Sequence, residues 1–285
     1  GSSPTSGTIT SKQVITNMIH TRIFWVVLSG VMMLGLNNNA NAWSADGHTA
    51  IGVLAMDQLK PDAKDTLQAI VGTLDADAMI KACNWPDAIR ETEEWKWTSP
   101  RHYVNIPRGE TSFEESRDCP DQLCATQAIK KFATGLGNDE ATKEQRWQSF
   151  AWLCHVVADL HQPLHAGFGD DRGGNSFAVS WHEEDLDLHT FWDHALIETH
   201  AGDWQDLVKQ MRQLPALPVA STWSPEDVDS WTNESHQLAE QAVYPETIEL
   251  SDTYVEKSWE IAQRQIRTAA SRLALIINSE LTAYD

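Results

Sequence analysis

Positively charged residues are scarce in this sequence of 285 residues. Lys and Arg together number 21 against 41 Asp and Glu, which gives a formal net charge of −20 at pH 7. Such a surface repels DNA and RNA at long range, which argues against nonspecific nucleic-acid binding through a broad basic patch. The chain can therefore accept a polyanion only where something local reverses the field, such as bound metal ions.

Cysteine is also scarce, and its spacing argues against one kind of metal site. The four cysteines include no CxxC pair, so they do not resemble zinc ligands. Cys119 and Cys124 bracket only Pro-Asp-Gln-Leu, a short loop that a disulfide can close. Cys83 and Cys154 are a candidate second pair, but the sequence does not show whether they meet. Export of the chain would permit such disulfides.

The apolar run near the start of the sequence is too short for a transmembrane helix. The apolar run at residues 23–36 has fourteen residues, whereas a transmembrane helix needs about 20. Arg22 precedes this run, and Ala40-Asn41-Ala42 follows it as a small-x-small cleavage site. These features predict a signal peptide at residues 18–42, with residues 1–17 as upstream sequence outside the fold. The alternative, an uncleaved membrane anchor, fits the length and the flanks less well.

Cleavage after Ala42 would leave residues 43–285 as one exported domain, periplasmic or secreted and without a stable membrane anchor. These 243 residues hold 19 basic and 41 acidic side chains, a net charge of −22, because Lys12 and Arg22 lie in the removed part. The length suits a single domain, and no linker divides it. We expect a monomer.

Helical periodicity dominates this domain, with neither an internal repeat nor a βαβ alternation. One expected helix begins at a cap on Ser44 or Asp46 and ends near Leu59. Residues 91–125 are expected to be irregular, with a short extended piece at 101–106, and residues 176–181 alternate like a strand or hairpin. The sequence therefore predicts a mostly α, single compact multi-helix domain with a small β-hairpin. The other expected helices are 61–71, 75–83, a short one from 87, 126–136, 143–160, 186–200, 204–213, 225–243 and 251–281.

Six of the eleven histidines lie between positions 155 and 194. His155 and Asp159 are four residues apart on an expected helix, so their side chains share one face. His189 and Asp193 repeat that spacing on another expected helix, and His165 lies between the two pairs. A single HxxxD pair on a helix is more often a surface or capping pair. Two pairs that flank a third histidine favour a metal site instead, and imidazole with carboxylate and no thiolate suits zinc in an open, catalytic site.

Asp159 strengthens the case for a metal ion. The expected helix around it is apolar, with Leu153, Val156, Val157 and Leu160 nearby. Burying an ionised carboxylate there is costly unless a cation is its partner. No lysine or arginine occurs between positions 147 and 171, so a metal ion is the simplest partner.

Six motifs follow one another in a characteristic order: WSADGH, NWPDAIR, RHYVN, HVVADLHQPLH, GGN and HTFWD. In this respect the chain, from Trp43 to about Leu281, resembles the three-zinc, single-strand-specific nucleases of the S1/P1 family. The resemblance implies a phospholipase C/nuclease-type trinuclear zinc fold. It also implies hydrolysis of single-stranded DNA and RNA to 5′-phosphate and 3′-hydroxyl ends, together with 3′-nucleotidase activity on nucleotides. The signal peptide and the single glycosylation sequon, Asn233-Glu-Ser235, favour a bacterial member.

The resemblance also implies a set of nine metal ligands. Trp43 would bind the first zinc through its own α-amine and backbone carbonyl, and this amine can act as a ligand only when it is free and deprotonated. Asp159 would bridge the first and second zinc ions. The first zinc would further take His48, the second Asp87, His102 and His155, and the third His165, His189 and Asp193.

Further residues take roles in the reaction by the same resemblance. Asp87 would orient a water molecule or accept its proton, and the planar donors of Arg90 would stabilise the phosphate in the transition state. Tyr103 takes the place of an aromatic residue that stacks on an unpaired base, although ordinary core packing is an equal alternative. Asn175 of the GGN motif, and His194 where the family commonly has asparagine, complete the predicted substrate contacts.

Two other functions compete with the nuclease. Zinc phospholipase C shares the fold, but its last ligand is usually glutamate rather than aspartate, and its segment between the positions of His165 and His189 is shorter. A non-catalytic zinc-binding protein is the alternative of another class. The complete ligand set, without a cysteine to close the site, favours open coordination and catalysis over zinc storage.

The predicted amine ligand gives the first test. A chain that retains residues 1–42 should be nearly inactive on single-stranded DNA, because the nitrogen of Trp43 is then an amide and cannot bind zinc. N-terminal residue determination must accompany the assay, and full activity of a demonstrably uncleaved chain would contradict the prediction.

Overall fold

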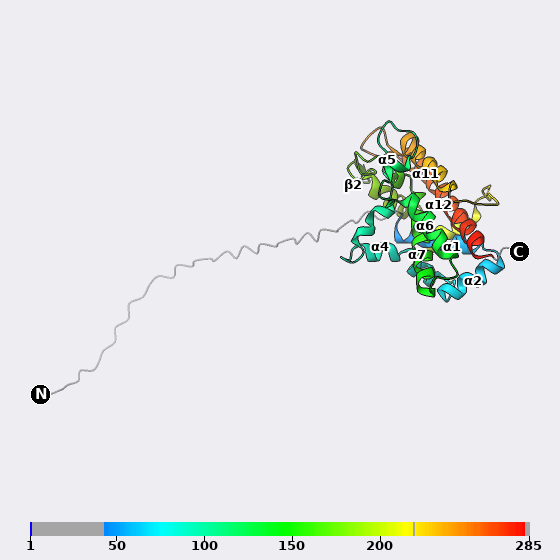
Figure 1. The fold of residues 1–285 in the computed structure, drawn as a ribbon. Coiled ribbons are helices and arrows are strands. Elements are labelled where there is room, and N and C mark those ends of the chain that lie inside the picture. Colours follow the sequence, from blue (N-terminus) through cyan, green and yellow to red (C-terminus); the bar gives the residue numbers. More distant parts are fainter. Residues whose placement is uncertain (2–42, 219, 283–285) are drawn as a thin grey trace, which may run out of the picture. The chain divides into compact units, whose positions relative to one another are not determined.

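Helices form most of the chain that the structure describes (Figure 1). The computed structural model describes residue 1, residues 43–218 and residues 220–282, so the predicted signal peptide and residues 2–17 lie outside it. The mostly α fold with one small hairpin is confirmed. The elements are α1 (Ala45–Met56), α2 (Pro61–Val71), α3 (Ala76–Cys83), α4 (Trp85–Arg90), η1 (Lys96–His102), α5 (Glu115–Asp118), α6 (Ala125–Gly137), α7 (Lys143–Leu160), η2 (Pro163–Ala166), β1 (Ala178–Trp181), β2 (Glu184–Asp187), α8 (Leu188–Thr190), η3 (Phe191–Ala195), α9 (Leu196–His200), α10 (Trp204–Gln213), α11 (Asp227–Leu238), η4 (Ala239–Val243) and α12 (Asp252–Leu281).

Helix α7 lies at the centre of the core. It begins at a capping box in which the Thr142 hydroxyl accepts from the Gln145 amide, and every residue from Ser149 to Leu160 is buried. Helices α1, α3, α6 and α12 all pack against it. A helix that is buried on all sides has apolar residues on all sides. In the last two turns of α7, the only polar side chains are His155 and Asp159.

The start of the domain is held against α7. The Trp43 side chain is fully buried, and its indole Nε1 donates a 3.1 Å hydrogen bond to the Ala158 carbonyl. A Cβ at Gly47 would lie 2.6 Å from the Trp43 Cβ, so only glycine fits where α1 crosses this residue. Helix α1 ends at Met56, three residues earlier than predicted, because the Asp57 amide already closes the last turn onto Ala55.

The predicted helix at 186–200 begins later than expected. Leu186 and Asp187 instead belong to β2, which pairs antiparallel with β1 in the register Val179–Leu186. The Asp187 carboxylate then caps the next helix by accepting from the Thr190 amide at 2.8 Å. The helix widens into a π-helical turn at η3, which contains Asp193. The expected strand or hairpin is confirmed as this two-stranded sheet.

The prediction for residues 91–125 was partly wrong. Arg101 and His102 lie in the short helix η1 rather than in an extended piece, and α5 adds a further turn. The chain becomes extended only from Tyr103, where the Val104 amide donates to the His165 carbonyl at 2.8 Å. No helix among residues 43–218 and 220–282 is long and apolar enough to cross a membrane.

Both candidate disulfides form. Cys119–Cys124 closes the short loop before α6, and Cys83–Cys154 joins the end of α3 to α7 across 71 residues of sequence. The Cys83–Cys154 pair sits next to Gly52, where a Cβ would lie 2.6 Å from the Cys83 sulfur. The second pair, which the sequence left open, is therefore part of the core.

The two disulfides should differ in what they contribute to stability. The Cys83→Ala/Cys154→Ala variant should lose about 4 kcal/mol of unfolding free energy, whereas Cys119→Ala/Cys124→Ala should lose about 2 kcal/mol, because the longer loop restricts the unfolded chain more. Urea unfolding of both variants in EDTA measures the difference without a contribution from metal. A larger loss from the short loop would contradict this account.

Candidate metal centre

Three clusters of histidine and aspartate lie close together inside the domain. In each cluster the potential ligand atoms lie within 4.8 Å of one another. All of the residues are buried except Asp87, whose side chain is 11 % exposed. The clusters are His48–His155–Asp159, Asp87–His102–His155 and His165–His189–Asp193.

Asp159 stands at the centre of the first two clusters. Its Oδ1 lies 3.4 Å from His48 Nε2. Its Oδ2 lies 3.0 Å from His102 Nδ1 and 3.2 Å from His155 Nε2. The two oxygens thus face different histidines, which is the arrangement a carboxylate needs to bridge two cations.

Asp87 closes the second cluster from the opposite side. It lies in the first turn of α4, and its Oδ1 is 3.6 Å from His102 Nδ1 and 3.5 Å from His155 Nε2. Those two ring nitrogens are themselves 2.9 Å apart. Asp87, His102 and His155 therefore aim three ligand atoms at one point.

The third cluster is built on the short elements after α7. His165 Nε2 and His189 Nε2 approach to 3.0 Å, and His189 Nε2 lies 3.2 Å from Asp193 Oδ2. The spacing of four residues brings the side chains of His189 and Asp193 together, although the helix passes from α8 into the π-helical turn η3 between them.

Backbone carbonyls hold the histidine rings in one orientation. The Nδ1 group of His155 donates to the Cys83 carbonyl at 2.8 Å, that of His165 to the His102 carbonyl at 2.5 Å, and that of His189 to the Gly173 carbonyl at 2.6 Å. With the proton on Nδ1, the Nε2 lone pair points into the cluster. The Cys83–Cys154 disulfide places one of these carbonyls.

Gln162 supports the third cluster and was missed in the sequence. Its side-chain amide donates to Asp193 Oδ1 at 2.6 Å, and its carbonyl oxygen accepts from the Leu164 amide at 2.7 Å. The residue is fully buried. Gln162 lies within the HQPLH motif, but the spacing of that motif does not show whether its side chain is exposed to solvent or binds a neighbouring carboxylate.

A cation fits the buried oxygens. Asp159 Oδ1 and Asp193 Oδ2 are buried and accept no hydrogen bond from any described residue, although each lies within 3.4 Å of an imidazole nitrogen. An ionised carboxylate in such a place needs a cation. Nitrogen and oxygen donors without thiolate suit zinc, and clusters of three protein ligands leave a position open.

Burial and neighbouring charges oppose each other at this centre. Burial disfavours ionisation of Asp159, but His155 and His102 outweigh it and hold the pKa of Asp159 well below its usual range. Burial also disfavours the charge on His155, but Asp159 and Asp87 raise its pKa to about 10. Burial lowers the pKa of His165 to about 4. Without metal, His155 therefore carries a proton at neutral pH, and a metal ion that binds there displaces it.

Trp43 lies beside the first cluster. The amide of the next residue, Ser44, donates to the Asp193 carbonyl at 2.7 Å, and the His48 amide donates to Ser44 one turn into α1. The start of the domain is thereby tied to both the first and the third clusters. The ligand role of the Trp43 amine remains a prediction.

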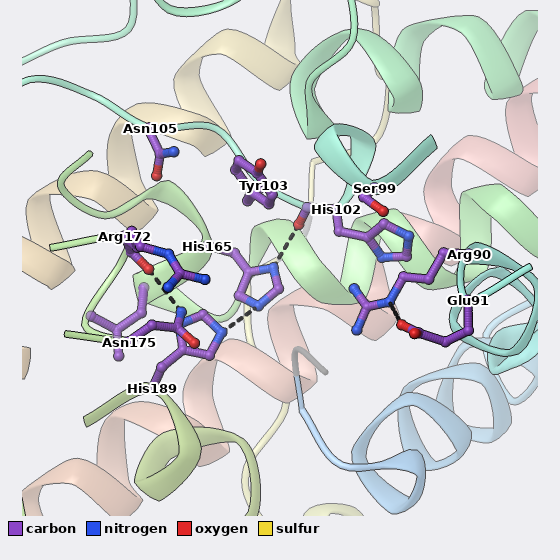
Figure 2. Close-up of a pocket in the computed structure, with 11 residues that line it drawn as sticks. Arg90, Glu91, Ser99, His102, Tyr103, Asn105, His165, Arg172, Asn175 and His189 are labelled. Carbon is purple, nitrogen blue, oxygen red and sulfur yellow. Dashed lines mark hydrogen bonds and ion pairs between the residues drawn. The ribbon is translucent and has the colours of Figure 1, made fainter. Parts of the chain in front are cut away.

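A pocket of about 280 Å³ opens over the second and third clusters (Figure 2). Arg90, Tyr103 and Asn175 line it as the sequence interpretation requires, and Tyr103 is 39 % exposed. His194 is half-buried in η3 and is not among the described residues of the pocket wall. Five further wall residues had no predicted role: Glu91, Ser99, Asn105, Leu164 and Arg172.

Arg90 approaches the centre through Asp87. Its Nε lies 3.3 Å from Asp87 Oδ1 and 3.7 Å from Glu91 Oε1, and its side chain is only 11 % exposed. Figure 2 shows its guanidinium beside the His102 ring. Arg90 thus also pairs with Glu91, but its contact with Asp87 brings it to the metal centre.

A helical domain with three adjacent histidine–carboxylate clusters, two of them open to one pocket, defines a class of metal-dependent hydrolases. The chain belongs to the S1/P1 Nuclease family, whose model matches residues 43–282. This confirms the prediction of a hydrolytic enzyme of the nuclease type.

Named relatives support the same assignment. Endonuclease 3 of Arabidopsis thaliana is 31% identical over 225 residues, which cover 76% of this chain and 75% of the relative. Nuclease P1 of Penicillium citrinum is 25% identical over 83% of this chain and 97% of its own. Nuclease S1 of Aspergillus oryzae is 22% identical over 85% and 92%. These relatives are plant and fungal proteins.

The two carboxylates that face different clusters should have separable effects on metal content. Asp159→Asn should lose metal from the first two clusters together, because its two oxygens serve both. Asp193→Asn should chiefly disturb the third. Elemental analysis of zinc-reconstituted protein measures the stoichiometry, and an unchanged zinc content in Asp159→Asn would rule out the bridge.

Proposed function

We propose that this chain is an exported zinc-dependent endonuclease that hydrolyses single-stranded DNA and RNA, leaves 5′-phosphate and 3′-hydroxyl ends, and also acts as a 3′-nucleotidase. The observation that supports it most is the grouping of three histidine–aspartate clusters, of which the second and third line one pocket together with Arg90 and Tyr103. Three zinc ions match the three clusters. The particular nuclease activities of the relatives are extended to this chain only as part of the proposal.

Zinc bound at this centre would act as a Lewis acid that activates water near neutral pH and neutralises charge on the phosphate. The chain's own residues do the rest. Asp87 faces both the second cluster and Arg90, so its carboxylate can orient a water molecule and accept its proton. The guanidinium of Arg90 can donate to a phosphate oxygen from the same side.

Tyr103 supports the preference for single strands. Its side chain is 39 % exposed and lines the pocket directly after the ligand His102, which argues against the alternative of core packing. An exposed aromatic ring can stack on a base only when the base is unpaired. Asn175, whose side-chain amide donates to the Arg172 carbonyl at 2.7 Å, faces the same space.

The charge balance agrees with this proposal. Residues 43–285 carry a net charge of −22, so attraction of a polyanion depends on the pocket itself. Three divalent ions, together with Arg90, would provide positive charge in the pocket.

We further propose that residues 43–285 form the mature, monomeric domain after cleavage of residues 18–42. Its two disulfides fit an oxidising compartment, and we keep a bacterial origin as part of this proposal.

The decisive test of the function is a comparison of substrates. Zinc-loaded protein should release acid-soluble nucleotides from single-stranded DNA and RNA much faster than from duplex DNA, lose that activity in EDTA, and recover it with zinc. Release of diacylglycerol from phosphatidylcholine without nucleotide release would identify a phospholipase C instead. Tight zinc binding without hydrolysis of any phosphodiester would identify a zinc-binding protein.

Arg90 gives a sharper test of the chemistry. Arg90→Lys should lower kcat by about ten- to a thousandfold with KM and zinc content little changed, because lysine keeps the charge but loses the planar fork that suits the transition state. Arg212→Lys is a matched control, since Arg212 also forms an ion pair with a carboxylate, that of Asp57, but on the exposed surface. Wild-type kcat in Arg90→Lys would remove Arg90 from the catalytic residues.

A further inference from the structure

The loop between η2 and β1 has an unusual backbone. Arg172, Gly173 and Gly174 all have positive φ angles, of 58°, 62° and 83°. Glycine adopts this conformation without cost, whereas a residue with a long side chain rarely does. A Cβ at Gly173 would collide with the Leu164 carbonyl. Within these three residues of positive φ, Arg172 is the only one that carries a side chain.

Two sets of contacts fix this loop against the metal centre. The Gly173 carbonyl accepts from His189 Nδ1 at 2.6 Å, and the Gly173 amide donates to the Phe168 carbonyl at 2.8 Å. The Gly174 amide donates to Asp171 Oδ1 at 2.9 Å. Arg172 is thus one residue away from the carbonyl that orients a predicted metal ligand.

The acidic residues of the loop are already paired with another arginine. Arg108 Nε lies 2.9 Å from Asp170 Oδ2, its Nη2 lies 3.2 Å from Asp171 Oδ2, and its guanidinium lies 3.9 Å from the centre of the Phe168 ring. Arg108 thereby fixes the loop from outside. The two carboxylates next to Arg172 in sequence do not neutralise it.

The Arg172 side chain is exposed and lines the pocket (Figure 2). Its guanidinium makes no hydrogen bond or ion pair with any residue in the part of the chain that the structure describes. Figure 2 shows it beside Asn175 and His189, on the side of the pocket opposite Arg90. Arginine remains charged and offers five donors, so this group is available for an anion.

We infer that Arg172 binds a phosphate next to the scissile one in the nucleic-acid strand, and so selects polynucleotides over substrates with a single phosphate. The inference rests on the proposed nuclease function. Arg90 lies beside the Asp87–His102–His155 cluster, whereas Arg172 lies beside the His165–His189 side. A pocket of about 280 Å³ is at the lower limit for a small-molecule site, so a strand extends beyond it, and Arg172 lies on one of the walls that the strand can pass.

Kinetics with two substrates test the inference. Arg172→Gln should lower kcat/KM for single-stranded thymidine tetranucleotide by about five- to thirtyfold, the loss expected for one charge-assisted contact. It should change kcat/KM for thymidylyl-thymidine, which has one phosphate, by less than about twofold. Arg172→Lys should recover part of the loss. Equal losses on both substrates, or no loss on either, would overturn the inference.

A second measurement locates the phosphate. Each phosphate of a fluorescent tetranucleotide is replaced in turn by a neutral methylphosphonate, and binding is followed by anisotropy. In the wild-type protein one flanking replacement should weaken binding, and in Arg172→Gln the same replacement should have no further effect, because the pair forms a double-mutant cycle. Additive losses at every position would overturn the inference.

Two controls separate the inference from its alternatives. Arg264→Gln removes a positive charge from an exposed site on α12, outside this pocket, and should leave both substrates unaffected. Zinc content should be unchanged in Arg172→Gln, and a loss of zinc would show a structural role instead. If the wild-type protein cleaves neither substrate, the proposed function fails, and the methylphosphonate scan still decides whether Arg172 binds a flanking phosphate.

Discussion

A carboxylate near the end of helix α7, in the part of the helix that is fully buried, is the constraint on which the rest of the site depends. Asp159 has no exposed surface and faces three histidines from three separate elements. Because an ionised carboxylate is costly in such a place, the surrounding chain must bring positive charge to it. Helices α1 and α7 and the short helix η1 pack so that this charge can be a metal ion.

The outer contacts of the clusters are also part of the core. The His102 carbonyl orients His165, so one residue serves the second cluster through its side chain and the third through its backbone. The Cys83 carbonyl orients His155, and the disulfide from Cys83 to Cys154 links the same two helices, α3 and α7. A change in the packing of α3 on α7 therefore moves a predicted metal ligand, so the stability of the core and the geometry of the candidate metal centre are coupled.

The sequence predicted the parts of this protein that depend on local pattern. Helix α7 has the predicted bounds, since its capping box and the following proline mark both ends. The spacing of His155 and Asp159 placed both on one face. Spacing carries no information on long-range contacts, so Gln162 and Arg172 were missed. The strand at Leu186 was predicted as helix, because its partner β1, rather than its own residues, decides its conformation.

Charge explains why the two arginines of the pocket behave differently in an otherwise acidic protein. Arg90 is held by Asp87 and Glu91, so its position is fixed before any substrate arrives. This suits a group that stabilises a transition state, where reorganisation is costly. Arg172 is instead positioned by its backbone, while Arg108 neutralises the acids beside it. A fixed backbone with an uncommitted guanidinium suits a contact that must form and release with each strand, since a group already paired within the protein would have to break that pair first.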